Sequence, residues 1–476
     1  MNYMPPILDD SPGLSYDYRP GAIDSESAAE AIGRLDVFHG YMGVFIVAFL
    51  VTLLATPIMR RLAIANGVID RPDDPRKVHK IPVAYLGGVA VFIGILAGVA
   101  YSYAAAGSAL PLIESHVFNQ QPVPFSVLAG LMLIMLAGLG DDVFGMSPRI
   151  KIALQLVAAA ALALEDVGVK VAQGVLGPIG ALIGNERLIY TITAPEWLHF
   201  LEPGAQMLQL DLIYWAGTAI IAVFILGACN ASNLIDGLDG LCSGVTAIAA
   251  AGLLIIALTL AVQSDGPLDS SRLVLCLCLL GACMGFLPHN FNPATIFLGD
   301  AGSMLLGYTT IVIVLTLGDT GKTPLVVAGL IIYSLPIIDT TLAIVRRKLT
   351  GRSMSDADDQ HLHHMLKRAL GVKGAVFTMY GIAASFAALG VLISLGRARV
   401  AYAIALVIAA YIVVTAIKIA RRSMIESQAA DACMLERSMA APTTPNAGDP
   451  PPARPRRGRA PAKDGAPIED PDPHPA

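Results

Sequence analysis

Long apolar runs alternate with short polar stretches over most of this chain of 476 residues. A helix needs about 20 apolar residues to cross a hydrocarbon core of roughly 30 Å. By this length criterion the pattern predicts eleven spanning helices, several of them short, and therefore an all-α polytopic membrane protein. The predicted spans are residues 41–59, 86–104, 125–140, 151–165, 212–228, 242–263, 272–287, 302–317, 323–345, 376–395 and 399–420.

Three segments outside these spans have a composition of their own. The run 171–184 is apolar but short and rich in Gly, so we expect an interfacial helix or hairpin within a long outer loop, 166–211. Residues 1–39 are polar and acidic, and residues 423–476 are rich in Pro, Ala and Arg. Such compositions bury too little apolar surface to offset the entropy of ordering. We therefore expect two disordered extensions around one transmembrane domain, residues 40–422.

Five polar stretches follow the first, third, fifth, seventh and ninth predicted spans. They hold most of the Asp, Asn and His residues that could do chemistry. Odd-numbered spans all end at the same face of the membrane, so the pattern predicts that these five segments meet in one site at that face. They are residues 70–82, 140–151, 230–240, 290–303 and 346–373.

The distribution of charge assigns this face to one side of the membrane. Only 14% of the residues are charged, whereas a soluble domain carries about 25%. The loops on the side of the polar stretches carry fifteen Lys and Arg residues, and the opposite loops carry six. Because positive residues concentrate on the cytoplasmic side, we expect a cytoplasmic-face site, an external N-terminus and an internal C-terminus.

Two of the polar stretches contain grouped carboxylates. Asn233, Asp236 and Asp239 are spaced three apart, so on a helical turn they would share one face. Asp141 and Asp142 end the third predicted span, where adjacent carboxylates repel each other unless a cation or a shared proton relieves them. Such oxygen ligands suit Mg²⁺, and an acid beside a metal can act as a base or a nucleophile. The alternative for both groups is a set of solvated acids at helix ends.

The fourth polar stretch combines a glycine turn with an acid, an amide and an aromatic ring. Asp300 lies in the segment Gly-Asp-Ala-Gly-Ser, residues 299–303, which opens a predicted helix and could offer backbone N–H groups to a phosphate. Asn290 and Phe297 precede it, one for hydrogen bonding and one for stacking. A glycine-rich turn alone is weak evidence, but here it follows two other acidic clusters.

The fifth polar stretch concentrates histidine. Three of the nine histidines of the chain, His361, His363 and His364, lie within four residues. Zinc is one candidate ligand, although no Cys or Glu completes a site at a usual spacing. The other reading is that histidines and basic side chains facing the acids hold a diphosphate. The accompanying basic residues are His79, Lys80 and Arg347, of which the first two also fit an ordinary positive-inside loop.

Acids for a metal, basic groups for phosphates and an aromatic ring for a planar base indicate a nucleotide-diphosphate substrate. The many spans indicate an acceptor that resides in the lipid. A transporter would place ionisable groups along a path near the bilayer midplane, and Asp339 is the one acid well inside a predicted span. We interpret Asp339 as paired with neighbouring helices or as structural support for the site, in preference to a role in ion translocation. A non-catalytic scaffold would not explain acids, amides and histidines in five separate loops.

Taken together, the motifs resemble the polyprenyl-phosphate N-acetylhexosamine-1-phosphate transferases (glycosyl transferase family 4) over about residues 40–420. The resemblance implies transfer of a sugar-1-phosphate from a UDP-sugar to undecaprenyl phosphate in the bacterial inner membrane, with release of UMP. It implies Mg²⁺ as cofactor, with Mn²⁺ as an alternative, and no nucleic acid partner; a homodimer stays open. The segments that carry it are 70–79, 87–88, 140–142, 233–241, 290–303 and 361–364.

The resemblance also implies roles for individual residues. Asp300 would be the principal Mg²⁺ ligand and Asp236 a supporting one. Asp141 would deprotonate the lipid phosphate or attack as a nucleophile, and Asp142 would help to position it. The remaining positions would bind the nucleoside, the diphosphate or the sugar, and they are Asn233, Asp239, Asn290, Phe297, His79, Lys80, Arg347, His361, His363 and His364.

Within the family, His361-x-His363-His364 is similar to the branch that transfers N-acetylglucosamine-1-phosphate. The lipid-linked product of that branch starts a cell-envelope polysaccharide such as O-antigen or teichoic acid. The peptidoglycan-precursor branch, which uses UDP-MurNAc-pentapeptide, shows three consecutive histidines instead. The same chemistry with another UDP-N-acetylhexosamine stays an alternative.

Overall fold

The structure of the protein is a computed structural model. It describes residues 34–70, 82–106, 123–185, 188–193, 207–263, 268–319, 321–349 and 361–396, with isolated positions from 399 to 425. The chain divides into two compact units, Met1–Ala420 and Arg421–Ala476, and the elements from α1 to α12 described below belong to the first. Most of the two predicted extensions lies outside the described residues, so their disorder stays a prediction.

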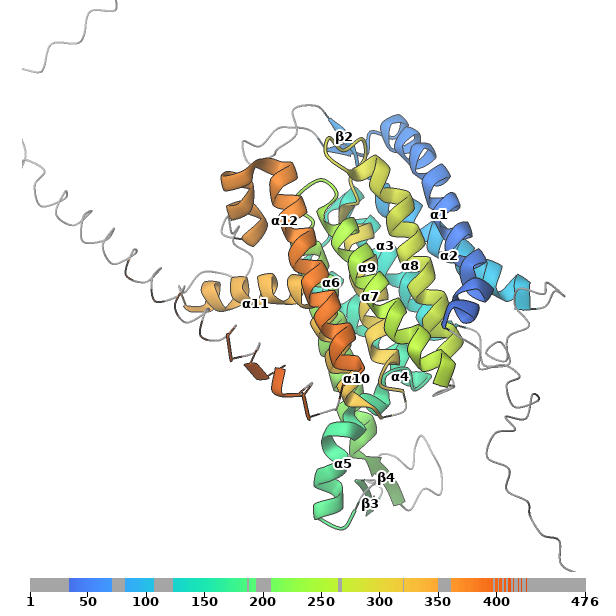
Figure 1. Ribbon diagram of the computed structural model, residues 1–476, viewed down its shortest axis with the longest axis vertical. Coiled ribbons are helices and arrows are strands. Elements are labelled where there is room, and N and C mark those ends of the chain that lie inside the picture. Colours follow the sequence, from blue (N-terminus) through green and yellow to red (C-terminus); the bar gives the residue numbers. More distant parts are fainter. Residues whose placement is uncertain are drawn as a thin grey trace, which may run out of the picture. The chain divides into compact units, whose positions relative to one another are not determined.

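Helices make up most of the described chain, and most of them run side by side in one bundle (Figure 1). Eight are long and apolar enough to cross a membrane, and the described residues give up to ten spans if each of two bent pairs counts as one. The prediction of an all-α polytopic membrane protein is confirmed. The helices are α1 (Arg34–Ala65), α2 (Gly87–Ala106), α3 (Phe125–Phe144), α4 (Pro148–Leu164), α5 (Gln173–Leu182), α6 (Leu212–Ile235), α7 (Leu241–Gln263), α8 (Asp269–Asn290), α9 (Gly299–Thr316), α10 (Thr323–Ile332), α11 (Ser334–Leu349) and α12 (Leu362–Ser394).

Two of the eleven predicted spans are not seen as single straight helices among the described residues. The last predicted span, 399–420, is described only at isolated positions. The predicted span 323–345 is not one straight helix, because α10 and α11 meet at Tyr333 with a bend of 78°. Pro336 lies in the first turn of α11 and has no N–H to continue the ladder of α10. Figure 1 shows α11 lying across the direction of the neighbouring helices.

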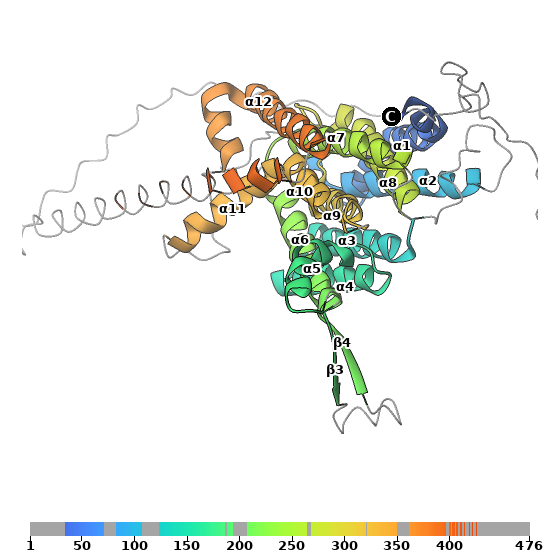
Figure 2. The same cartoon turned by 60° about the horizontal axis from the view of Figure 1, so that its bottom comes forward.

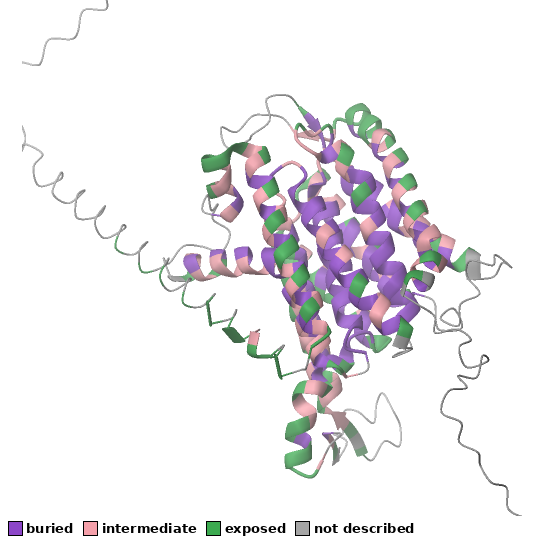
Figure 3. Ribbon diagram, viewed as in Figure 1, coloured by how far each residue is buried: buried purple, intermediate pink, exposed green. Residues whose placement is uncertain are grey.

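Helices α8 and α9 lie at the centre of the bundle. Of the α9 span 94% is buried, against 28% of the α1 span, and Figure 3 shows the buried residues gathered in the interior. Small residues let neighbouring helices approach closely. A Cβ at Gly88 would overlap the backbone of Gly302, and a Cβ at Gly138 would overlap that of Ala301. Helices α2 and α3 are therefore pressed against the first turn of α9.

Two small antiparallel sheets accompany the helices. Strands β3 (Ile189–Thr193) and β4 (Met207–Asp211) pair as a ribbon that extends away from the bundle (Figure 2). The ribbon follows α5, which with a short 3₁₀ turn (Val169–Ala172) is bent by 85° from α4. A short helix thus lies within 171–184, and the interfacial position predicted for this segment stays a prediction. Strands β1 (Ile69–Asp70) and β2 (Val83–Ala84) form the second sheet.

A buried charge cluster joins the N-terminus of α8 to the end of α9. Arg272 is 1% exposed and donates to Asp269 at 2.6 Å and to the backbone carbonyl of Thr316 at 2.6 Å. Its guanidinium also lies 3.2 Å from Asp319. Asp319 in turn accepts a hydrogen bond from the backbone N–H of Leu268. Because buried charges are costly unless they are paired, this cluster fixes the register of the two central helices.

Candidate active site

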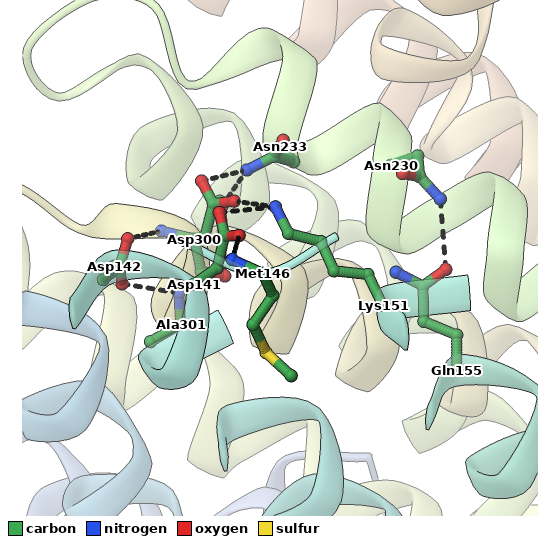
Figure 4. Close-up of polar contacts among 10 residues, drawn as sticks. Asp141, Asp142, Met146, Lys151, Gln155, Asn230, Asn233, Asp300 and Ala301 are labelled. Atoms are coloured by element: carbon green, nitrogen blue, oxygen red, sulfur yellow. Dashed lines mark hydrogen bonds and ion pairs between the residues drawn. The ribbon is translucent and has the colours of Figure 1, made fainter. Parts of the chain in front are cut away.

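One ammonium group bridges two carboxylates where α3 ends and α4 and α9 begin (Figure 4). The Nζ atom of Lys151 lies 2.6 Å from an oxygen of Asp141 and 2.6 Å from an oxygen of Asp300. The turn between α3 and α4 makes this possible. Gly145 takes the left-handed conformation with φ 69°, and Pro148 opens α4. The backbone N–H of Met146 donates to the second oxygen of Asp141 at 2.7 Å.

Helix α6 adds an amide to this cluster. The side-chain N–H₂ group of Asn233 donates to Asp300 at 2.7 Å and to the hydroxyl of Ser303 at 3.1 Å. Asp300 is thus held from two sides, by Lys151 and by Asn233. Four helices contribute side chains to a connected polar group: one each from α3, α4 and α6, and two from α9. The predicted convergence of the second, third and fourth polar stretches is observed in the structure.

Asp142 contacts the backbone of α9. Its two carboxylate oxygens accept hydrogen bonds from the backbone N–H groups of Asp300 at 2.8 Å and of Ala301 at 3.0 Å. A carboxylate at the second and third N–H groups of a helix acts as an N-cap and suits the positive end of the helix dipole. Asp142 therefore holds the segment that carries Asp300, whereas the residue it was expected to position is Asp141.

Asp236 directly follows α6 and lies in a concentration of negative charge. Burial raises the pKa of the Asp236 carboxyl well above its usual range, and the neighbouring carboxylates of Asp300, Asp142 and Asp239 raise it further. A divalent cation would relieve this repulsion. Among the described residues no group of three or more His, Cys, Asp and Glu side chains surrounds a single metal position. Mg²⁺ is usually bound by one or two carboxylates, and water and substrate phosphates complete its coordination. Asp236 and Asp300 fit this preference.

Asp239 and Asn290 hold the loop between α8 and α9. Asp239 accepts hydrogen bonds from the side chain of Asn292 at 2.8 Å and from the backbone N–H of Ala294 at 3.0 Å. Asn290 is 2% exposed. It accepts from the backbone of Gly240 and the hydroxyl of Ser243, and it donates to the carbonyl of Ile296. These contacts give both residues a structural task in addition to the substrate contacts predicted for them.

Phe297 lies at the end of this loop, against the segment that precedes α2. Its backbone N–H donates to the carbonyl of Ala84 at 2.8 Å, and its carbonyl accepts from Gly87 at 3.1 Å. The ring of Phe297 meets that of Tyr85 edge to face at 6.0 Å between centroids. The ring is only partly buried. The segment that follows the first polar stretch therefore contacts the fourth stretch, and two aromatic rings lie together there.

The three histidines form one cluster of rings at the start of α12. The centroids of His363 and His364 lie 4.3 Å apart, and the rings of His361 and His363 stack at 5.5 Å. Asp339 of α11 accepts a hydrogen bond from Nδ1 of His361 at 3.0 Å. Asp339 is thus paired with a residue at the start of a neighbouring helix, and its role as support for the site stays a prediction.

The histidine cluster touches the loop that carries Asp236. A Cβ at Gly237 would overlap Nε2 of His363, so this nitrogen lies directly against the backbone that follows Asp236. Arg347 lies in the last turn of α11, the helix that carries Asp339. His79 and Lys80 lie outside the described residues, so their substrate contacts stay predictions.

Lys151 is the site residue that the sequence analysis left without a role. From the sequence, Lys151 is one of the fifteen basic residues in the loops on the side of the polar stretches. A signal was available, because a lysine in the first turn of a helix opposes the helix dipole and lies at the start of an apolar span. Beside it, Gln155 of α4 accepts from Asn230 of α6 at 3.1 Å, which extends the polar contact between these two helices (Figure 4).

Comparison with known proteins adds an independent finding. Residues 124–318 match the model of "Glycosyl transferase family 4". The decaprenyl-phosphate N-acetylglucosaminephosphotransferase of Mycolicibacterium smegmatis is 33% identical over 79% of this chain and 87% of its own length. A Bacillus subtilis protein described as a probable undecaprenyl-phosphate N-acetylglucosaminyl 1-phosphate transferase is 32% identical, over 68% and 76%. The corresponding α-N-acetylglucosaminyl enzyme of Escherichia coli is 27% identical, over 72% and 81%.

Proposed function

The chain belongs to glycosyl transferase family 4, and we propose that it transfers N-acetylglucosamine-1-phosphate from UDP-N-acetylglucosamine to undecaprenyl phosphate. In this reaction a phosphate oxygen of the lipid forms a bond to the phosphorus that carries the sugar. The bond from that phosphorus to the bridging oxygen breaks, and UMP leaves with that oxygen. The product is a lipid-linked diphosphate sugar.

The connected group Asp141–Lys151–Asp300–Asn233 is the single observation that carries this proposal. Phosphoryl transfer depends mainly on positioning and on neutralising charge. Asp141 is placed to take the proton of the lipid phosphate, or to attack as a nucleophile in a two-step reaction. Lys151 supplies positive charge beside it and holds it next to Asp300.

The other side chains bind the donor. Asp300 and Asp236 would hold Mg²⁺, or Mn²⁺ in its place, and the metal when bound neutralises the diphosphate. The exposed part of Phe297 beside Tyr85 offers a stacking surface for uracil. The histidine cluster and Arg347 face the diphosphate and the sugar.

The membrane orientation follows from the basic residues. Lys151 at the start of α4 and the Arg346–Lys348 run at the end of α11 accompany the site. By the positive-inside rule this end of the bundle faces the cytoplasm, where UDP-sugars are made. The N-terminus is then external and the C-terminus internal, in the inner membrane of a bacterium.

The test is a donor panel. Purified protein in lipid nanodiscs is supplied with undecaprenyl phosphate, Mg²⁺ and one of several donors: UDP-N-acetylglucosamine, UDP-N-acetylgalactosamine or UDP-MurNAc-pentapeptide. We expect UMP release with the first donor, and loss of release in Asp300→Ala, which should still insert and fold. UMP release with only another donor would correct the sugar. No release with any UDP-sugar would refute the proposal, and a transporter would then be tested by uptake into vesicles.

A second measurement separates the two roles of Asp141. If the carboxylate forms a covalent intermediate, labelled UMP exchanges into the UDP-sugar in the absence of lipid acceptor. If Asp141 acts as a base in a one-step transfer, no exchange occurs until the acceptor is added. Asp141→Asn should abolish net transfer in either case.

A further inference from the structure

Asp339 uses both carboxylate oxygens on the first residues of a different helix. One oxygen accepts from the backbone N–H of Leu362 at 2.9 Å, and the other accepts from Nδ1 of His361 at 3.0 Å. Nδ1 of His363 lies 3.8 Å from the same oxygen. Asp339 is 6% exposed, so these contacts are shielded from water. A single carboxylate on α11 thus meets the α12 backbone and two of its imidazole rings.

The backbone contact caps α12. His361 precedes the helix with extended geometry (ψ 149°), and its own side chain makes no capping hydrogen bond. The first N–H groups of a helix need an external acceptor, and Asp339 supplies one from a neighbouring helix. The direction in which α12 starts, and with it the position of His363 and His364, is therefore tied to α11.

The imidazole contact orients the rings. Because the carboxylate accepts from Nδ1 of His361, this nitrogen carries a proton, and in the neutral ring Nε2 is left as the acceptor. His363 stacks on His361 with an angle of 16° between the rings. The Nε2 edge of His363 then lies against Gly237, next to Asp236. Asp339 is on the far side of the rings from this edge.

We propose that Asp339 is a positioning residue for the transfer reaction: it fixes the tautomer of His361 and the orientation of the histidine cluster, and presents the cluster to the Asp236–Asp239 loop. The inference rests on the proposed function, because it assigns the histidines to the diphosphate. Asp339 itself touches neither substrate. Partners that orient a functional histidine commonly change activity by about 10- to 100-fold when they are lost.

Two substitutions separate capping from ring orientation. In Asp339→Asn the side-chain carbonyl can still cap Leu362, but the amide N–H₂ group then faces Nδ1 of His361, so the ring must either shift its proton to Nε2 or turn away. Asp339→Ala removes both contacts. We expect Asp339→Asn to keep the melting temperature near that of the unchanged protein while kcat falls by about 10- to 100-fold. Asp339→Ala should lose both stability and kcat.

The matched control is Asp319→Asn, which changes another buried, ion-paired aspartate in the Arg272 cluster, away from the site residues. It should lower the melting temperature and leave kcat and the KM for the UDP-sugar unchanged in the folded fraction. Asp339→Asn with unchanged kcat would reduce Asp339 to a cap and overturn the proposal. An equal loss of kcat in Asp319→Asn would also overturn it, because the effect would then be general instability.

A readout without turnover keeps this inference distinct from the proposed function. Carbethoxylation of histidine by diethylpyrocarbonate can be mapped by mass spectrometry at each ring. In the unchanged protein His361 and His363 are 5% and 1% exposed and should react slowly. Asp339→Asn should speed their modification relative to His289, which lies at the end of α8. Unchanged rates would refute ring positioning, whether or not the protein releases UMP from any donor.

Discussion

The carboxylate of Asp142 accepts a hydrogen bond from the backbone N–H of Asp300 at 2.8 Å, although the two residues lie 158 positions apart in the chain. The neighbouring N–H of Ala301 donates to the same carboxylate. Of two adjacent acids, Asp141 therefore points to the cation of Lys151 and Asp142 to the backbone of α9. Asp141 is thus the acid that contacts the cation. Asp142 is the acid that holds the first turn of α9, which carries Asp300.

Replacing Asp142 tests this division. We expect Asp142→Ala to lower the free energy of unfolding by about 1–2 kcal/mol, the usual cost of losing an N-cap. It should also lower kcat, because Asp300 loses its anchor. Asp142→Asn keeps one acceptor oxygen, so its free energy of unfolding and its kcat should lie between those of Asp142→Ala and the unchanged protein. Melting temperature and UMP release measure the two effects, and a variant that keeps both values would contradict the capping role.

Replacing Lys151 tests the bridge between the two acids. In Lys151→Met the carboxylates of Asp141 and Asp300 lose their shared cation, and we expect UMP release to fall by about 10²- to 10³-fold, as for other groups that stabilise charge in a transition state. Lys151→Arg should recover only part of this, because a planar guanidinium does not replace a point charge. Lys170→Met, outside the site, is the control and should have normal turnover. Normal turnover in Lys151→Met would remove this lysine from the mechanism.

A methyl group at position 237 tests the contact between the histidines and the loop that follows α6. In Gly237→Ala the new Cβ would overlap Nε2 of His363, so the ring must move, and we expect UMP release to fall while the melting temperature changes little. Gly227 offers a matched control on α6, because a Cβ there meets no atom within 4 Å. Gly227→Ala should leave turnover unchanged. Equal turnover in the two variants would show that the position of His363 does not matter.

The crowding of acids around Asp236 predicts a dependence of stability on pH and on metal. A carboxyl whose pKa is raised in the folded state holds its proton more tightly there than in the unfolded chain. The contribution of this carboxyl to the free energy of unfolding is therefore greatest below the unfolded pKa of about 3.9. It declines as the pH rises towards the raised pKa of the folded state. Asp236→Asn removes this decline, so near neutral pH with a chelator the variant should melt at a higher temperature than the unchanged protein.

Titration with Mg²⁺ completes that experiment. A cation bound by Asp236 and Asp300 stabilises the folded state by mass action, and the unchanged protein should gain melting temperature as Mg²⁺ is added. Asp236→Asn should gain less. Identical Mg²⁺ responses in the two proteins would exclude Asp236 as a ligand.

The sequence predicted the helices well, because an apolar run of spanning length reports directly on burial in lipid. Runs such as 125–140 and 242–263 became α3 and α7 within a few residues. The bend between α10 and α11 does not follow from the length and apolarity of 323–345. It follows from Pro336, which lacks the backbone N–H that a continuous helix needs. Alternation of spans then placed the second, third and fourth polar stretches together, as observed.

Which partner each polar side chain of the site contacts could not be predicted from the sequence. Spacing predicts Asp236 and Asp239 on one helical face, which is wrong because α6 ends at Ile235, and Asp239 binds the loop at Asn292 and Ala294. That contact depends on how α8 and α9 are joined, and no local pattern encodes it. The pairing of Lys151 with Asp300 likewise depends on the crossing of α4 and α9. Residue types indicated the chemistry, whereas packing decided which residue meets which.

The Arg272 cluster at the other end of α8 and α9 has a consequence for biogenesis. Asp319, which follows α9, pairs with Arg272 of α8, and Arg272 also pairs with Asp269 of its own helix, so three buried charged groups meet where the two helices pack. A lone helix that exposed such groups to lipid would meet a cost of a few kcal/mol per charge. We therefore expect the translocon to release α8 and α9 into the bilayer as a preassembled hairpin, with the loop that carries Phe297 already formed at its tip.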